Sequence, residues 1–219
     1  MKFFRYFIYI TFHWNLKIAW HIIQLEIKGE KKYGIDTTGA DELQHLEKKG
    51  IDTGHATIYM PASYDLLERV FDNLPVTRRH HFLDIGCGKG RALCIAAHHG
   101  FAKVTGIDFS KKLCTAAEMN LSKTQLQVPS LQYEIINNDA FYFEIPADVD
   151  CIFLFNPFDE VIMSGVVNNI VESLANAPRK LLVVYANPLH KELFEEEGFE
   201  EIYYSKEMKY LELSILIKN

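Results

Sequence analysis

From residue 81 onward, short apolar runs alternate with stretches of helical periodicity, and this alternation limits the chain to few architectures. The predicted strands cover 81–85, 103–108, 132–137, 151–155, 180–186, 201–206 and 210–218, and the predicted helices between them cover 90–99, 110–121, 159–176 and 189–197. Strands that alternate with helices form a parallel sheet covered on both faces. The sequence therefore predicts an α/β fold with a doubly wound, mostly parallel seven-stranded sheet and a C-terminal antiparallel strand pair.

The part of the chain before this alternation predicts an N-terminal helical extension and lid over residues 1–58, followed by the α/β domain over 59–219. An amphipathic helix is expected over 64–74, and Pro61 suits the approach to its first turn. Residues 1–28 are strongly aromatic and apolar, and their periodicity predicts one helix. Its polar residues form a single stripe: His13, Lys17, His21, Gln24 and Lys28.

The first 28 residues leave two interpretations open. A signal peptide and a membrane-spanning helix both fit poorly, because His13, Asn15 and Lys17 interrupt the apolar run. The helix can pack on the domain or on a second subunit, as a homodimer contact. It can instead lie in a membrane surface, where Tyr and Trp rings suit the interface and basic residues suit anionic lipid.

Charge is unevenly distributed along the chain. Residues 1–33 hold six basic and two acidic residues, a local charge of +4, while the whole chain carries −6 and the remainder therefore −10. A body this acidic argues against nucleic acid as the main partner, because phosphate binding needs a basic face.

The cysteines and histidines limit the redox environment and the kinds of site that the chain can have. Four cysteines without a CxxC pair indicate reduced thiols and a cytoplasmic protein, which would be peripheral at the membrane under the second interpretation. The histidines follow no metal-ligand spacing, so no metal site is expected.

Polar and glycine residues follow the predicted strands at their carboxyl ends, where open α/β sheets bind ligands. The first strand ends in Asp84 and the turn Gly86-x-Gly88-x-Gly90, whose glycines allow a sharp turn and the close approach of a ligand. Asp108 ends the second strand, and its carboxylate can accept from both hydroxyls of a ribose. The Gly-x-Gly-x-Gly spacing of the turn differs from the Gly-x-Gly-x-x-Gly pattern of dinucleotide-binding turns.

These residues resemble the class I S-adenosylmethionine (SAM)-dependent methyltransferases. Phe82-Leu83-Asp84-Ile85-Gly86-Cys87-Gly88-Lys89-Gly90-Arg91 looks like their motif I, Thr105-Gly106-Ile107-Asp108 like motif II, and Asn138-Asp139-Ala140 like the adenine-contact motif. The resemblance covers about residues 60–219. It implies the seven-stranded fold and SAM as cofactor, with Asp108 and Asp139 as ribose and adenine contacts.

The chemistry of SAM agrees with the residue types at the turn. SAM lacks a pyrophosphate but carries an ammonium and a sulfonium, which favour acidic residues nearby. The residues expected to bind it are Asp84, Gly86, Cys87, Gly88, Gly90, Asp108, Phe109, Asp139, Ala140 and Asn156. Two alternatives to a methyltransferase remain open. One is an NAD(P)-dependent oxidoreductase, and the other is a membrane-associated SAM-binding protein without catalytic activity.

Two finer resemblances indicate nitrogen as the methyl acceptor, on a protein side chain or a small molecule. Asn156-Pro157-Phe158 is similar to the Asn-Pro-Pro-Tyr/Phe motif of amino and amide N-methyltransferases, but is one residue short. Tyr59-Met60-Pro61-Ala62-Ser63 and the helix after it are similar to a family of seven-stranded protein lysine methyltransferases. We therefore expect Asn156 to orient the acceptor, Tyr59 to help wall the pocket, and residues 29–60 to form much of the lid.

Overall fold

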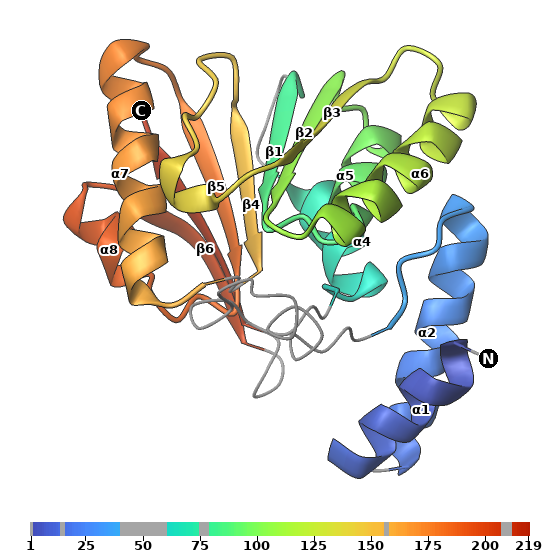
Figure 1. Ribbon diagram of the computed structural model, residues 1–219. Coiled ribbons are helices and arrows are strands. Elements are labelled where there is room, and N and C mark those ends of the chain that lie inside the picture. Colours follow the sequence, from blue (N-terminus) through green and yellow to red (C-terminus); the bar gives the residue numbers. More distant parts are fainter. Residues whose placement is uncertain (1, 14–15, 40–60, 75–78, 156–157, 207–211) are drawn as a thin grey trace.

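The computed structural model describes residues 2–13, 16–39, 61–74, 79–155, 158–206 and 212–219 (Figure 1). The helices are α1 (Lys2–His13), α2 (Leu16–Tyr33), α4 (Tyr64–Asn73), α5 (Arg91–His98), α6 (Lys111–Gln127), α7 (Glu160–Asn176) and α8 (Glu192–Glu196), with a short 3-10 turn, η1 (Ala140–Tyr142). The strands are β1 (His81–Ile85), β2 (Lys103–Asp108), β3 (Gln132–Asn137), β4 (Cys151–Phe155), β5 (Leu181–Ala186), β6 (Glu200–Lys206) and β7 (Glu212–Lys218).

The strands form one seven-stranded sheet in the order β3-β2-β1-β4-β5-β7-β6. Strands β1 to β5 are mutually parallel, whereas β7 lies between β5 and β6 and runs antiparallel to both. This confirms the predicted doubly wound sheet and its C-terminal antiparallel pair. The strand order reverses at β1, which pairs with β2 on one side and with β4 on the other. Ligands of open α/β sheets bind at such a reversal.

Helices cover both faces of the sheet. Successive side chains of each strand point to opposite faces, so each strand contributes to two cores. Phe82 belongs to a core shared with α4, α5 and α6, while its neighbour Leu83 belongs to a second core shared with α7 and α8. Figure 1 shows these helix sets on opposite sides of the sheet. Four predicted strands, β1 to β4, have the bounds that the sequence predicts.

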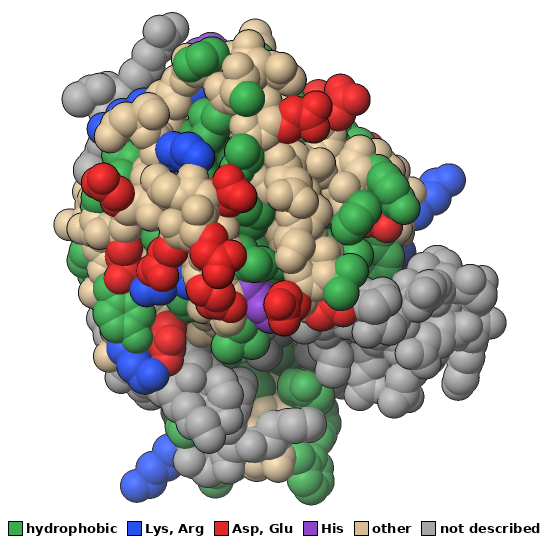
Figure 2. Space-filling view, turned by 90° about the vertical axis from the view of Figure 1, so that its left-hand side faces the viewer, with side chains coloured by type: hydrophobic (Ala, Val, Ile, Leu, Met, Phe, Trp, Pro, Cys, Tyr) green, Lys and Arg blue, Asp and Glu red, His purple; other side chains and the backbone are tan. Residues whose placement is uncertain are grey.

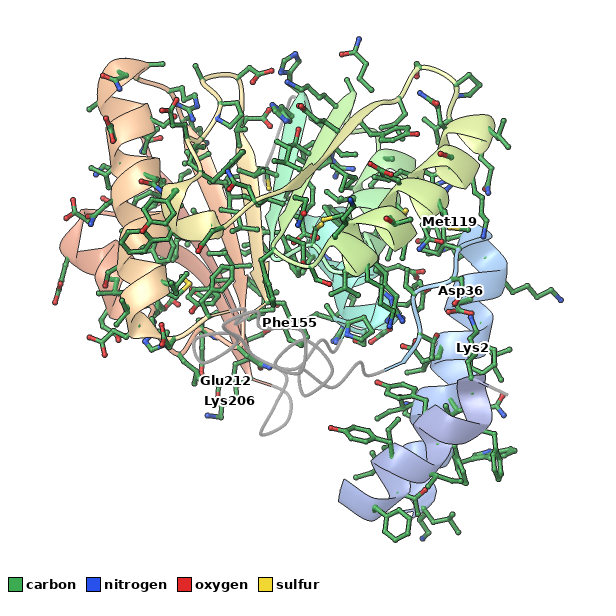
Figure 3. The ribbon with its side chains drawn as sticks, viewed as in Figure 1. Lys2, Asp36, Met119, Phe155, Lys206 and Glu212 are labelled. Carbon is green, nitrogen blue, oxygen red and sulfur yellow. The ribbon has the colours of Figure 1, made fainter. Side chains whose placement is uncertain are left out.

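The N-terminal segment is a helical hairpin, so the prediction of one helix over residues 1–28 is wrong. Lys2 at the start of α1 forms ion pairs with Glu30 near the end of α2 and with Asp36, the latter at 2.5 Å (Figure 3). In one continuous helix, Lys2 and Glu30 would stand about 42 Å apart. Instead α1 and α2 pack together around a small core of Tyr6, Ile10, Ala19 and Ile23.

Acidic side chains gather on the face that carries α7 and α8 (Figure 2). Five exposed carboxylates follow one another in and after α8: Glu192, Glu195, Glu196, Glu197 and Glu200. The N-terminal hairpin lies across the sheet from α8 (Figure 1). The acidic face over α7 and α8 is therefore separated in space from the basic N-terminal segment. None of the helices that the structure describes is long and apolar enough to cross a membrane.

Candidate functional site

The glycine turn after β1 folds over the end of β2. Gly86, Gly88 and Gly90 have φ angles of 86°, 54° and 77°, in the left-handed region that favours glycine. The backbone N–H groups of Gly86 and Cys87 donate to the carbonyl of Ile107, at 2.9 and 3.0 Å. The structure thus brings the four predicted turn residues to the carboxyl edge of the sheet, where α5 begins.

Asp108, at the end of β2, holds the glycine turn in place. Its Oδ2 accepts from the Gly88 N–H at 2.9 Å, and its Oδ1 accepts from the Ser110 N–H at 2.8 Å. Burial raises the pKa of the Asp108 carboxyl, and these two backbone donors oppose the rise. Each carboxylate oxygen can accept a second hydrogen bond, so the predicted contacts with ribose hydroxyls are compatible with this positioning role.

Asp84 is the second buried carboxylate at the turn, only 4% exposed. Burial raises the pKa of the Asp84 carboxyl well above its ordinary value, and the neighbouring Asp108 carboxylate raises it further. Among the residues that the structure describes, no hydrogen bond reaches the Asp84 carboxylate. A ligand cation placed here would stabilise both acids, and the ammonium and sulfonium of SAM meet that requirement.

The third predicted acidic residue, Asp139, follows β3 and caps the turn η1. Its Oδ1 accepts from the Phe141 N–H at 2.9 Å, and the side chain is exposed. Ala140, beside it, is buried. Capping occupies one lone pair of the Asp139 carboxylate and leaves others for a ligand. The contact with an adenine amino group stays a prediction.

Two further predicted cofactor residues pack near the end of β2. Phe109 is half-buried, and its carbonyl accepts from Nδ2 of Asn137 at 2.8 Å. Cys87 is buried against the backbone of β2, where a Cβ added at Gly106 would lie 2.8 Å from its Sγ. Burial raises the pKa of the Cys87 thiol well above its ordinary value, which favours a neutral, packed thiol over a thiolate.

A buried ion pair connects the hairpin to the helix that starts at the glycine turn. Arg91, the first residue of α5, donates from Nη1 and Nη2 to the two carboxylate oxygens of Glu26 in α2, at 2.8 and 2.5 Å. Its Nε donates to Oγ1 of Thr37 at 2.8 Å, and its guanidinium stands 4.0 Å from the ring centre of Tyr64. The Tyr64 ring in turn occupies the space that Gly29 of α2 leaves free of a side chain.

The segment after α2 lies against the glycine turn. Asn120 of α6 bridges the two, because its Nδ2 donates to the carbonyls of Asp36 and Lys89, at 3.0 and 2.9 Å. The Asp36 N–H returns a hydrogen bond to Oδ1 of Asn120 at 2.8 Å, and Lys89 Nζ donates to the Thr38 carbonyl at 3.4 Å. Residues 34–39 therefore lie against the glycine turn, whereas the lid over residues 29–60 stays a prediction.

This network was not predicted from the sequence. In the sequence, Arg91 is only the last residue of the glycine-turn motif, and no pattern indicates a role for Glu26, Thr37 or Asn120. One signal was available: Arg91 precedes the apolar run Ala92–Ala97, where a charged residue must be paired to be buried. Its partner could not be identified, because Glu26 lies 65 residues away in the sequence.

The two predicted catalytic residues, Asn156 and Tyr59, lie outside the described residues. Their surroundings are partly described. Phe155 ends β4 at the carboxyl edge of the sheet (Figure 3), and β4 lies next to β1 with Phe153 opposite Asp84. In the sequence, residue 156 directly follows β4, and its acceptor-orienting role stays a prediction.

Comparisons with known proteins agree with this architecture. Residues 82–177 match the family described as "Methyltransferase domain". No curated protein matches the chain in sequence. Three similar solved structures are a protein from Pseudomonas syringae assigned as a methyltransferase, one so assigned from Escherichia coli, and the ribosomal protein L11 methylase of Lactobacillus delbrueckii subsp. bulgaricus.

These structural matches are close in fold and distant in sequence. The Pseudomonas protein has a TM-score of 0.52 at 17% identity, over 70% of this chain and 97% of its own. The Escherichia protein has a TM-score of 0.54 at 16% identity, over 73% and 89%. The L11 methylase has a TM-score of 0.50 at 16% identity, over 70% and 76%. The structural matches establish the fold, and the matched domain favours methyl transfer over the nicotinamide alternative.

Proposed function

Because residues 82–177 form a class I SAM-dependent methyltransferase domain, SAM is the cofactor, and we propose that the chain transfers the methyl group to a nitrogen acceptor. The acceptor nitrogen belongs to a protein side chain or a small molecule. The four free, buried cysteines suit a reducing compartment, so we place the enzyme in the cytoplasm.

One observation carries the proposal: the strand that leads into Asn156-Pro157-Phe158 adjoins the strand that leads into the glycine turn. Strand β4 pairs with β1 in register, with Leu83 opposite Ile152 and Asp84 opposite Phe153. The segment that resembles the acceptor motif of N-methyltransferases directly follows β4 in the sequence. Asn156 would accept a hydrogen bond from the acceptor amine and direct the nitrogen lone pair into the site.

The protein contributes binding and alignment. SAM supplies a methyl group on a sulfonium, which is already an excellent leaving group. Asp84 and Asp108 would hold the cofactor through charge and ribose contacts, while Tyr59 and residues 29–60 would wall the acceptor pocket and exclude water. Alignment of two reactants by a protein can contribute about 7–11 kcal/mol to a rate. A neutral amine needs no strong base, so an acid–base dyad is not required.

The surface charge disfavours nucleic acid as the acceptor. The chain carries a net charge of −6, and the face over α7 and α8 is densely acidic (Figure 2). Phosphate backbones are attracted by basic faces and repelled by acidic ones. A protein or small-molecule amine meets no such repulsion.

The variant Asn156→Ala tests the acceptor role. The full chain and the variant are incubated with methyl-labelled SAM and separate protein and small-molecule fractions of a cell extract. We expect the variant to bind SAM with nearly unchanged affinity and to lose turnover. Asn168→Ala, an exposed position on α7, is the matched control and should leave both unchanged.

The stability of the product bond and the position of the methyl group together identify the acceptor atom. Methylated nitrogen survives mild base, whereas methyl esters are hydrolysed, and mass spectrometry then locates the methyl group. Base-labile product from the wild type would contradict the nitrogen acceptor. Full turnover by Asn156→Ala would contradict the role of Asn156 without affecting the assignment of the cofactor.

A further inference from the structure

The N-terminal hairpin exposes an unusual amount of apolar side chain. On α1, Phe4, Ile8 and Phe12 follow at intervals of four residues and form one row, with Phe4 68% and Phe12 85% exposed. On α2, Leu16 and Trp20 are each 62% exposed. Contiguous exposed apolar surface of this kind marks an interaction site in soluble proteins.

Folding of the hairpin does not account for these side chains. The opposite sides of α1 and α2 already form the small core around Ile10 and Ile23. Glu26 faces the domain and binds Arg91, and Gly29 packs on Tyr64. The inward surface of the hairpin is thus occupied. Trp20 touches the ring of Phe7 edge-on, with ring centres 6.5 Å apart, yet stays 62% exposed, and Phe12 is 85% exposed. Figure 1 shows α1 and α2 extending away from the sheet.

The charges beside these rows are basic. The exposed charged side chains that the structure describes on the two helices are Lys17, Lys28, Lys31 and Lys32. The acidic residues of α2, Glu26 and Glu30, are buried and engaged by Arg91 and Lys2. Lys17 lies one turn before Trp20, and Lys31 one turn after Ile27, which is also exposed. The lysines therefore flank the apolar row of α2.

We propose that this hairpin binds an anionic lipid surface. The tip residues Phe12 and Leu16, with Ile8 and Trp20 on the next turns, enter the headgroup region. Aromatic side chains suit that depth, and the flanking lysines contact anionic headgroups. A second copy of the chain fits less well, because a two-fold contact through this surface would oppose the same lysines.

The distribution of charge over the whole molecule gives the bound orientation. The acidic face over α7 and α8 (Figure 2) would be repelled by anionic lipid, and it lies on the other side of the sheet from the hairpin (Figure 1). The hairpin can therefore contact the surface while the acidic face remains in water. The ion pair between Glu26 and Arg91 holds the domain to the bound hairpin.

The chain contains a built-in reporter for this binding. Both of its tryptophans, Trp14 and Trp20, fall in the N-terminal segment. The full chain is titrated with vesicles of phosphatidylcholine alone or mixed with phosphatidylserine, and tryptophan emission and cosedimentation are measured. We expect a blue shift and quenching by brominated lipid with the anionic vesicles, both weakened by added salt.

Two variants separate the apolar and the electrostatic contributions. Phe12→Ser with Leu16→Ser should weaken binding about tenfold or more. Lys17→Gln with Lys31→Gln should remove the preference for anionic lipid. The controls are Leu126→Ser, 84% exposed on α6, and Lys123→Gln with Lys180→Gln, which should bind like wild type. Circular dichroism confirms that each variant is folded.

The proposal fails under either of two results. One is that the wild type ignores both kinds of vesicle. The other is that the Phe12/Leu16 variant binds them as tightly as the wild type does. A homodimer in sedimentation analysis that Phe12→Ser with Leu16→Ser converts to monomer, without vesicle binding by either, would assign the surface to a second copy instead.

Discussion

Arg91 and Glu26 form a buried, two-point ion pair between residues that lie 65 positions apart, with both side chains less than 5% exposed. The pair joins the N-terminal hairpin to the first residue after the glycine turn. The guanidinium also donates to Oγ1 of Thr37 and to the carbonyl of Ala62. The hairpin is thereby anchored at the cofactor site as well as to the outside of the domain.

Removal of the Glu26 carboxylate should destabilise the protein strongly. Glu26→Ala leaves the Arg91 charge buried without its counterion, and loss of one partner of a buried pair costs about 3–5 kcal/mol. Unfolding in urea, followed by circular dichroism, measures the change. Lys32→Ala is the control, because its 2.9 Å pair with Glu68 also joins α2 to α4 but lies on the surface. It should cost about 0–1 kcal/mol. Equal losses of unfolding free energy in the two variants would show that the buried pair stabilises the protein no more than the surface pair does.

The pKa of Asp84 predicts that SAM binding depends on pH. The pKa of the Asp84 carboxyl is raised in the free protein, and a bound cation favours the charged form, so binding releases a proton. Affinity for SAM should therefore increase with pH up to the raised pKa and level off above it. Calorimetry in buffers of different ionisation enthalpy counts the released proton. An affinity that falls as pH rises over this range would contradict the role of Asp84.

Substitution of Asp84 should have opposite effects on binding and on stability. Asp84→Asn should weaken SAM binding about 10- to 100-fold, the range for a hydrogen bond to a charged group. Because the folded-state pKa is raised, the contribution of Asp84 to the stability of the free wild type should be highest at low pH. It should decline as pH rises from the ordinary value of the carboxyl to its folded-state pKa. The variant should lack that decline in thermal unfolding. Asp65→Asn, at an exposed position on α4, should retain it.

The backbone of the glycine turn can be tested against a matched glycine elsewhere. Gly90 and Gly100 have φ angles of 77° and 92°, but an added Cβ meets Ala117 Cβ at 3.1 Å only at Gly90 and meets nothing within 4 Å at Gly100. Alanine at either position should cost about 1–2 kcal/mol for the left-handed backbone. Gly90→Ala should cost more, because α5 and α6 must move apart, and it alone should impair SAM binding. Equal losses of stability and affinity in the two variants would exclude a specific role for Gly90.

The strands were predictable because local sequence determines them. Strands β1, β2 and β4 are almost wholly buried, so their apolar runs end where the strands end. Helix α6 continues beyond the predicted end at Leu121 to Gln127. Its last buried position is Thr124, whose hydroxyl donates to the Asn120 carbonyl, so the apolar periodicity stops before the helix does.

The hairpin was not predictable, because its contacts are distant in sequence. In the sequence, Glu26 is one charged residue in an apolar helix. Its contact with Arg91 is evident only in the folded chain. The same holds for Asn120, whose carboxamide joins the segment after α2 to the glycine turn. In contrast, the positions of Asp84 and Asp108 at the carboxyl edge of the sheet were predictable, because each lies at or next to the end of its strand and parallel strands bring their ends together. Their contacts with SAM stay predictions.

Titration of the full chain with SAM, and in parallel with NAD, tests the central claim most directly. Calorimetry should show saturable binding of one SAM per chain and no heat from NAD. Saturable binding of NAD, or the absence of SAM binding by the folded chain, would contradict the assignment of the glycine turn and its two carboxylates to SAM.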